Sequence, residues 1–230
     1  MRYRAAWLLL VWMSGCAEST QGLRVTSKNE GLPPRETVIA YAHRYVELQW
    51  VARPQHIFHG FDHAGVRIDT ADNGYVHDGW KIGNNIGVPY SWGGFDTPED
   101  FLRKLNDGWL AGNVPRGRDA RASSYSTGID CSGLVSRSWG LPRPYSTREL
   151  PAISVKLETF SALEPGDILN KSNGHVLLFE GFGDSTRSRV KVIEAGAWDG
   201  GPSKVVESEY SLEQLQHDGF VPLRDRRRLP

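Results

Sequence analysis

Two apolar segments near the C-terminus constrain the fold of this chain most strongly. Residues 175–182 (HVLLFEGF) and 189–195 (RVKVIEA) are rich in Val, Leu, Ile and Phe, and a Gly-Asp-Ser-Thr run lies between them. Two such segments joined by turn residues predict a β-hairpin. A third short strand is expected over residues 167–169, directly after a Pro-Gly turn. The C-terminal part of the chain is therefore predicted to form an antiparallel sheet.

Three helices are predicted ahead of these strands. The first covers residues 35–50, where apolar side chains recur at helical spacing before Pro54. The second covers residues 98–110, with Thr97 as its N-cap. The third begins at Cys131 and ends near residue 140, where a Gly-Leu-Pro sequence is a stop signal. Helices followed by an antiparallel sheet indicate the α+β class.

The N-terminus has the pattern of a bacterial export signal. Arg2 and Arg4 precede an apolar run over residues 5–13, which is shorter than the roughly 20 residues that a membrane-spanning helix needs. Small residues then lead directly to Cys16, and this resembles the lipobox of bacterial lipoproteins. The resemblance implies lipidation of Cys16 and an exported protein, on the periplasmic face of the outer membrane if the host has one and otherwise on the cell-surface membrane.

We therefore expect a signal peptide over residues 1–15, a polar tether over residues 16–33 and one catalytic domain over residues 34–230. The chain has 27 basic and 27 acidic residues, so its charge does not favour nucleic acid as a partner. The Arg-rich end, residues 224–228, is expected to be a solvated tail. Membrane contact is expected through the lipid alone.

The chain has two cysteines, and lipidation of one leaves Cys131 without a partner for a disulfide. An unpaired thiol is unusual in an exported protein unless it reacts. At the start of a helix, free backbone N–H groups and the positive end of the helix dipole favour the thiolate. Cys131 is therefore a candidate nucleophile.

A catalytic cysteine needs a base and a group that orients the base. His175 opens the first strand of the hairpin, and a turn about residues 184–185 places it directly opposite Glu194. Side chains so opposed have Cβ atoms about 4.5–5.5 Å apart, close enough for a carboxylate to hold an imidazole. A register shift of one residue moves Glu194 to the other face of the sheet.

Four segments resemble the NlpC-type cell-wall cysteine peptidases, which are papain-like bacterial enzymes. Residues 130–135 (DCSGLV) resemble the family's nucleophile motif, and residues 87–94 (GVPYSWGG) its Pro-Tyr-x-Trp-Gly-Gly segment. Residues 163–168 (LEPGDI) resemble its Leu-x-Pro-Gly-Asp-Leu element, and residues 174–181 (GHVLLFEG) its histidine strand. The four segments follow the family's order over residues 34–195.

The resemblance implies a papain-like domain with helices packed on a central antiparallel sheet and the nucleophile at a helix N-terminus. It implies hydrolysis of an amide bond in peptidoglycan stem peptides or muropeptides, of the γ-D-glutamyl–diamino acid type, by a monomer without cofactor or metal. The implied catalytic residues are Cys131 as nucleophile, His175 as base and Glu194, which stands where the family usually has His, Asn or Gln. The implied oxyanion and substrate-binding residues are Tyr90, Trp92, Asp130 and Ser132, the last two at the site for the free amino end of the stem peptide.

Three alternatives stay open at this point. The first is an amidase or acyltransferase that acts on another substrate through the Cys131–His175 pair, although the order of Cys before His favours the peptidase. A lipoprotein that binds wall fragments without catalysis is the second alternative. The third is a zinc site, because residues 55–95, expected to be ordered loop around a groove, contain several candidate ligands: His56, His59, Asp62, His63 and His77. The long segment 95–127 is expected to wall or cap the substrate groove.

Overall fold

The computed structural model describes residues 32–116, 121–196 and 201–229, and it has the predicted α+β class. The helices in these residues are α1 (Arg35–Val46), α2 (Pro98–Asn106), α3 (Cys131–Ser138) and α4 (Leu212–His217). The strands of the main sheet are β7 (Ser154–Lys156), β8 (Ile168–Asn170), β9 (Val176–Phe182), β10 (Arg189–Ala195), β11 (Val205–Ser211) and β12 (Val221–Asp225). All neighbouring strands of this sheet are antiparallel, in the order β11-β10-β9-β8-β12-β7.

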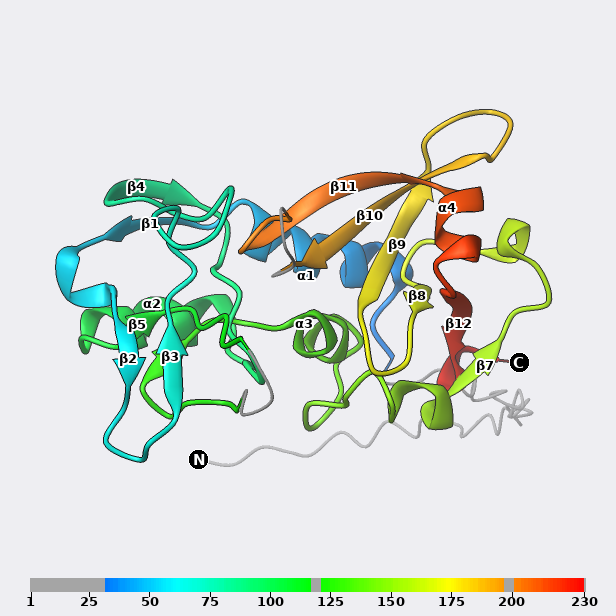
Figure 1. Cartoon of the computed structure of the whole chain (residues 1–230). Helices are drawn as coiled ribbons and strands as arrows, with labels where there is room; N and C mark the ends of the chain where they lie inside the picture. The colour runs from blue at the N-terminus through cyan, green and yellow to red at the C-terminus, as the bar shows by residue number, and fades with distance from the viewer. Residues whose placement is uncertain (1–31, 117–120, 197–200, 230) are drawn as a thin grey trace, which may run out of the picture.

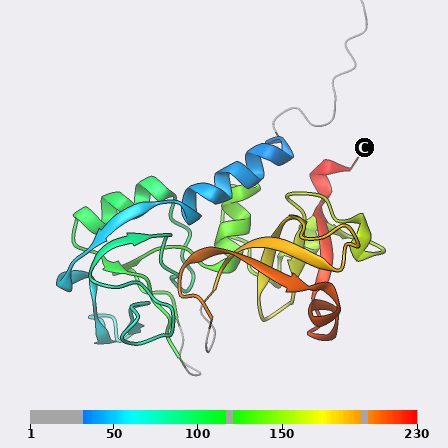
Figure 2. The same ribbon diagram turned by 90° about the horizontal axis from the view of Figure 1, so that it is seen from above.

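Smaller ribbons form the other side of the molecule, on the left of Figure 1. They are made by β1 (Gln49–Ala52) with β4 (Gly83–Ile86), β2 (His59–Phe61) with β3 (Arg67–Asp69), and β5 (Leu110–Ala111) with β6 (Ser126–Thr127). Helix α3 lies between these ribbons and the main sheet (Figure 1). Seen from above, α1 crosses the junction between the two sides (Figure 2). The N-terminus of α3 therefore lies where the two sides of the molecule meet.

The first half of β9, in the middle of the main sheet, is buried on both faces. Alternate residues of β9 point to opposite sides, as the pleat requires: Val176 and Leu178 join the core formed with α1 and α3, whereas Leu177 and Phe179 pack with Leu215 of α4. This explains why the strand has a continuous apolar sequence rather than an alternating one.

The helix starts agree with the prediction. Thr97 caps α2 by accepting a hydrogen bond from the Asp100 N–H at 3.1 Å, and Asp130 caps α3 in the same way. The end of the first helix was predicted wrongly, because α1 stops at Val46. Trp50 belongs instead to β1, where its indole is buried and donates to the Gly87 carbonyl at 2.9 Å.

Residues 55–95 contain more regular structure than the predicted loop, namely β2, β3 and β4. The connection between β2 and β3 is held by Asp62, whose carboxylate accepts hydrogen bonds from the backbone N–H groups of Ala64 and Val66. A turn held by hydrogen bonds between a side chain and the backbone can close a tight hairpin. The two strands then need no alternation of apolar residues, which is the pattern that would predict them.

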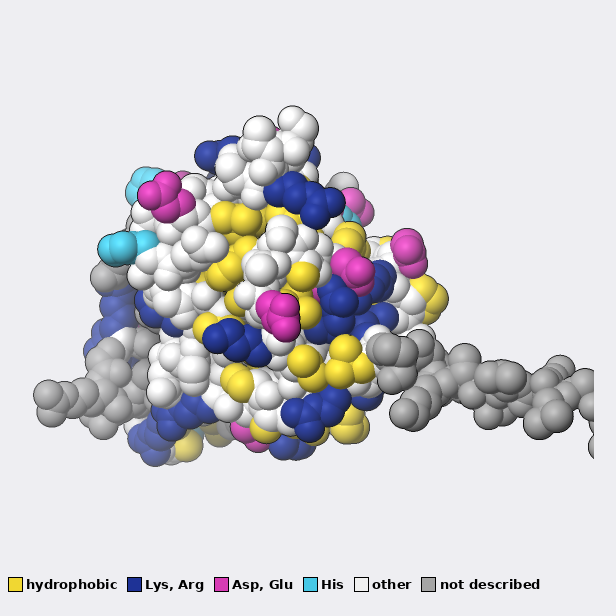
Figure 3. All heavy atoms as spheres, turned by 90° about the vertical axis from the view of Figure 1, so that its right-hand side faces the viewer, with side chains coloured by type: hydrophobic (Ala, Val, Ile, Leu, Met, Phe, Trp, Pro, Cys, Tyr) yellow, Lys and Arg dark blue, Asp and Glu magenta, His cyan; other side chains and the backbone are white. Residues whose placement is uncertain are grey.

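The expectation of a solvated C-terminal tail is wrong. Arg224 lies in β12 and contacts the buried carboxylate of Asp167 at 2.7 Å, and Arg227 pairs with Asp225 at 2.6 Å. On the side of the molecule where β7 and β12 lie, Lys and Arg side chains are spread among Asp, Glu and hydrophobic groups (Figure 3). The cluster of arginines in the sequence is thus part of the folded domain.

No helix in the described ranges combines the length and the apolar character that a membrane span requires. The predicted signal peptide and Cys16 lie outside the described residues, as does the tether except for its last two residues.

Candidate active site

Cys131 is the first residue of α3 and is 7% exposed. The preceding residue, Asp130, caps the helix: its Oδ1 accepts hydrogen bonds from the Gly133 N–H at 2.6 Å and from Ser132 Oγ at 3.0 Å. As the first helical residue, Cys131 keeps its own backbone N–H out of the helix ladder. The sulfur and a free N–H donor therefore lie at the same point.

His175 and Glu194 are in contact, but not in the predicted register. The structure pairs Val192 with Phe179 and Ile193 with Leu178 after a bulge in β9. Continuing this register puts Glu194 opposite Leu177, two positions along from His175, so the predicted direct pairing is wrong. A shift of two residues preserves the face of the sheet, and the side chains meet diagonally, with Nε2 and Oε2 2.7 Å apart.

The charged forms of His175 and Glu194 stabilise one another. Burial alone lowers the pKa of His175, but the charge and hydrogen bond of Cys131, together with the hydrogen bond and charge of Glu194, raise it to about 10. Burial acts to raise the pKa of Glu194, but hydrogen bonds and the His175 charge hold it below its ordinary value. The arrangement favours the imidazolium form of His175 beside the ionised Glu194 carboxylate.

Tyr210 of β11 is a site residue that the sequence reasoning missed. Its hydroxyl donates a 2.6 Å hydrogen bond to Glu194 Oε1, the oxygen that His175 leaves free. Burial and the Glu194 charge raise the pKa of Tyr210, so the phenol stays a donor. No local signal pointed to it, because β11 itself was not predicted and its contact with Glu194 depends on strand pairing.

Tyr90 lies close to the nucleophile. Its backbone donates to the Ser203 carbonyl at 2.7 Å and accepts from the Asn113 N–H at 2.9 Å, which fixes the segment on both sides. Burial raises the pKa of Tyr90 well above its ordinary value, and the charges of Cys131 and Asp130 raise it further. Its hydroxyl therefore remains protonated, as a hydrogen-bond donor must be.

Close backbone packing joins the segment 87–94 to the start of α3. The Gly93 N–H donates to Asp130 Oδ2 at 3.0 Å, and the Asp130 N–H donates to the Gly94 carbonyl at 3.2 Å. A Cβ on Gly133 would lie 2.2 Å from the Gly94 oxygen, so only glycine fits there. A Cβ on Gly94 would lie 2.6 Å from the Gly128 oxygen, so both segments need glycine where they pack together.

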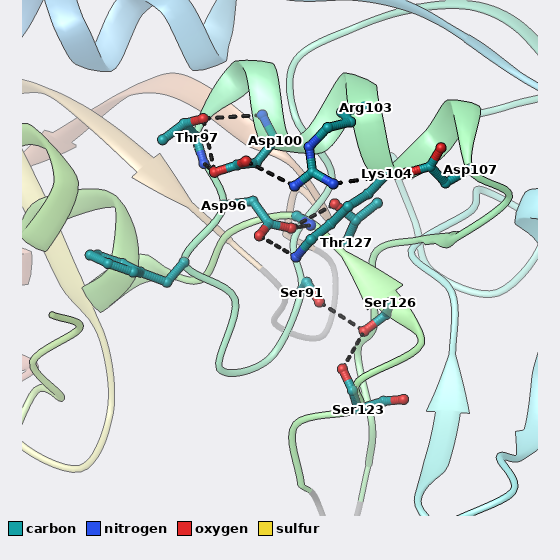
Figure 4. Close-up of polar contacts among 12 residues, drawn as sticks. Ser91, Asp96, Thr97, Asp100, Arg103, Lys104, Asp107, Ser123, Ser126 and Thr127 are labelled. Carbon is teal, nitrogen blue, oxygen red and sulfur yellow. Dashed lines mark hydrogen bonds and ion pairs between the residues drawn. The ribbon is translucent and has the colours of Figure 1, made fainter.

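A polar network supports the chain just before the nucleophile (Figure 4). Asp96 accepts hydrogen bonds from Thr127 Oγ1 at 2.6 Å and from the Gly128 N–H at 3.1 Å, and it pairs with Lys104 of α2 at 2.6 Å. Ser91 contacts Ser126 at 3.2 Å in the same view. Part of the segment 95–127 thus supports the chain just before Cys131, whereas none of its described residues lines the cavity that contains Cys131, where a wall or cap was predicted.

A groove of about 380 Å³ opens over the sulfur. It brings together five of the residues predicted for the site and six others. Its lining comprises Tyr90, Trp92, Gly93, Asp130, Cys131, Ser132, Ser146, Thr147, Arg148, Asn173 and Gly174. Trp92 is 44% exposed on its wall.

A second cavity of about 360 Å³ contains His175, Glu194 and Tyr210. Gly174 borders both cavities.

The element at residues 163–168 lies away from this groove. Asp167 is fully buried and binds Arg35 of α1 at 3.0 Å and Arg224 of β12 at 2.7 Å. The Gly166 carbonyl accepts a hydrogen bond from the Trp139 indole at 2.8 Å. This element joins the two termini of the domain to the sheet, so its role is structural.

The histidines of residues 56–77 are dispersed. His59 pairs with Asp72 at 2.9 Å, and His77 pairs with Asp78 at 2.8 Å. His63 lies instead against the ring of Tyr125. In the described ranges, one group of three side chains is close enough to hold a metal ion, and it is elsewhere: His43, Glu180 and Glu207.

Comparisons with protein-family models, with curated proteins and with solved structures give no match.

Proposed function

We propose that this protein is a papain-like cysteine peptidase of the NlpC type that hydrolyses an amide bond in peptidoglycan stem peptides. The observation that carries the proposal is the buried chain of contacts from Cys131 through His175 to Glu194. A nucleophile, a base and an orienting carboxylate in this order are the minimum machinery of thiol-dependent acyl transfer.

In the proposed reaction, the Cys131 sulfur attacks the carbonyl carbon while His175 holds the proton taken from the thiol. The tetrahedral oxyanion accepts hydrogen bonds from the Tyr90 hydroxyl and the Cys131 backbone N–H. The C–N bond then breaks, and His175 gives its proton to the leaving amine. Water attacks the thioester with His175 as base, which releases the acid and restores the thiol.

The four sequence segments support peptidoglycan as the substrate. We assign the scissile bond to the γ-D-glutamyl linkage to the diamino acid, and we assign Trp92, Asp130 and Ser132 to the walls that bind the peptide. In the free protein Asp130 already accepts three hydrogen bonds, from Gly93, Ser132 and Gly133. Its role is therefore to shape the groove with its remaining acceptor capacity directed at the substrate's amino end. Lipidation at Cys16 would keep this domain at the membrane.

The test is incubation of the purified domain with muropeptides of defined structure, with product masses read by mass spectrometry. The proposal expects cleavage at one stem-peptide linkage, and no cleavage by Cys131→Ser protein that retains its melting temperature. Intact substrates across every stem-peptide linkage, with an unmodified thiol, would refute the peptidase assignment and leave the other amidase, acyltransferase or binding functions.

A further inference from the structure

The charge of the groove over Cys131 comes from two side chains in the described part of the chain, Asp130 and Arg148. The Asp130 carboxyl group accepts hydrogen bonds from two backbone N–H groups of the protein itself, from Gly133 as the cap of α3 and from Gly93. Burial raises the pKa of Asp130, and both of its carboxyl oxygens already accept hydrogen bonds within the protein. Arg148 is exposed on the rim, and its guanidinium is the positive charge that the groove offers to a ligand.

The acidic residue next to Arg148 does not neutralise it. The Glu149 carboxylate accepts hydrogen bonds from the N–H and the hydroxyl of Ser146, both at 2.9 Å, and pairs with Arg143 at 3.0 Å. These bonds hold the pKa of Glu149 below its ordinary value, so the carboxylate is ionised and already bound. Within the described residues, no hydrogen bond or ion pair engages the Arg148 side chain.

The position of His175 indicates which part of a substrate lies near Arg148. His175 must reach the leaving amine to protonate it, so the leaving group lies on the histidine side of the sulfur. His175 also lines the second cavity, whereas Arg148 is not among the residues that line it. The acyl part of the substrate then lies over Tyr90, Ser132 and Arg148 in the first groove.

We propose that Arg148 determines specificity by binding a free carboxylate on the acyl part of the substrate. This inference rests on the proposed function. A γ-linked glutamate that donates its side-chain carboxyl to the scissile amide keeps its α-carboxylate free, and that group is an anion on the same residue as the reacting carbonyl, at the other end of the glutamate side chain. A guanidinium recognises a carboxylate through two parallel hydrogen bonds, whereas a carboxamide offers one acceptor and no charge.

The experiment compares two stem peptides that differ only in this group, one with the α-carboxylate and one with the α-carboxamide. We expect wild-type protein to prefer the carboxylate by about tenfold in kcat/KM, the effect of one charged hydrogen-bonded pair near the surface. Arg148→Gln should remove the preference, mainly through a higher KM for the carboxylate, and Arg148→Lys should restore part of it. Lys171→Gln, in the second cavity, should keep the wild-type ratio.

Equal rates on the two peptides with wild-type protein, or an unchanged ratio in Arg148→Gln, would overturn this inference while leaving the proposed function intact. Failure of wild-type protein to cleave either peptide would overturn both.

Discussion

Glu194 Oε2 lies 2.7 Å from His175 Nε2, although the two residues are diagonal neighbours rather than a directly paired couple. The carboxylate is held from its other oxygen by Tyr210, so its orientation is fixed by three strands. Since both side chains are buried, the pair can fix the tautomer of the imidazole and stabilise its charged form.

Glu194→Gln should lower kcat by at least about tenfold, because the amide removes the negative charge that stabilises the imidazolium. The measurement is steady-state kinetics on the muropeptide that the wild type cleaves, with circular dichroism to check the fold. Wild-type kinetics in a folded Gln variant would exclude Glu194 from the catalytic group.

The rate should depend on pH through His175, whose folded-state pKa of about 10 lies above its ordinary value of 6.5. Folding stabilises the charged imidazole. Its contribution to the free energy of unfolding is therefore complete below about pH 6.5 and is lost as pH rises through about 10. We expect kcat/KM to fall only as pH approaches 10, and Glu194→Gln to move this fall to lower pH. A fall near pH 6.5 in the wild type would contradict this.

Tyr90→Phe should lower kcat by about 100-fold with little change in KM, because a lost oxyanion donor acts on the transition state alone. Single-turnover kinetics would measure this at the acylation step. Tyr125→Phe serves as the comparison, since Tyr125 is 42% exposed and lines a different cavity. Equal rates for the two variants would remove Tyr90 from the oxyanion site.

Asp167→Asn should reduce the free energy of unfolding by about 2–4 kcal/mol, because Arg35 and Arg224 both lose a buried ionic partner. Urea unfolding followed by fluorescence measures this. Glu164→Gln is the matched control: Glu164 contacts the same two arginines but is 53% exposed, so the loss should be below about 1 kcal/mol. Similar losses in both variants would argue against the buried pair as a stabilising element.

Gly133→Ala should cost about 2 kcal/mol or more and abolish activity, because its Cβ would lie 2.2 Å from the Gly94 carbonyl oxygen and must push the two segments apart. Gly181→Ala has no atom within 4 Å of the added carbon and should have wild-type activity. The test is thermal unfolding together with turnover, and a fully active Gly133→Ala would show that this contact does not position the nucleophile.

The sequence predicts those parts of the fold that depend on local signals. Thr97 and Cys131 mark helix starts because caps and helix breakers act within one turn. Trp50 was misassigned to a helix. The hydrogen bond from its indole to the Gly87 carbonyl holds it in a strand, and Gly87 lies far along the chain, outside the reach of local signals. Arg224 was taken for part of a tail because its partner Asp167 is 57 residues away in sequence.

In the candidate site, too, the features that depend on local signals are predictable and those that depend on long-range contacts are not. Short motifs suffice to identify Cys131 and His175, and the structure brings both to one point. The bulge in β9 cannot be read from composition, and beyond it the observed register differs by two residues from the predicted one. The His175–Glu194 contact was predicted despite this error because an even shift retains the face. Tyr210 could not be found this way, since it reaches the site from a strand with a mostly polar sequence.

The central claim is that His175 activates Cys131, and alkylation of that thiol by iodoacetamide tests it most directly. The rate is followed at neutral pH by peptide mapping of Cys131, in folded wild-type and His175→Ala protein. We predict that removing His175 slows alkylation by about 100-fold, since the imidazolium that stabilises the sulfur anion is lost. Equal rates in the two proteins would contradict the account.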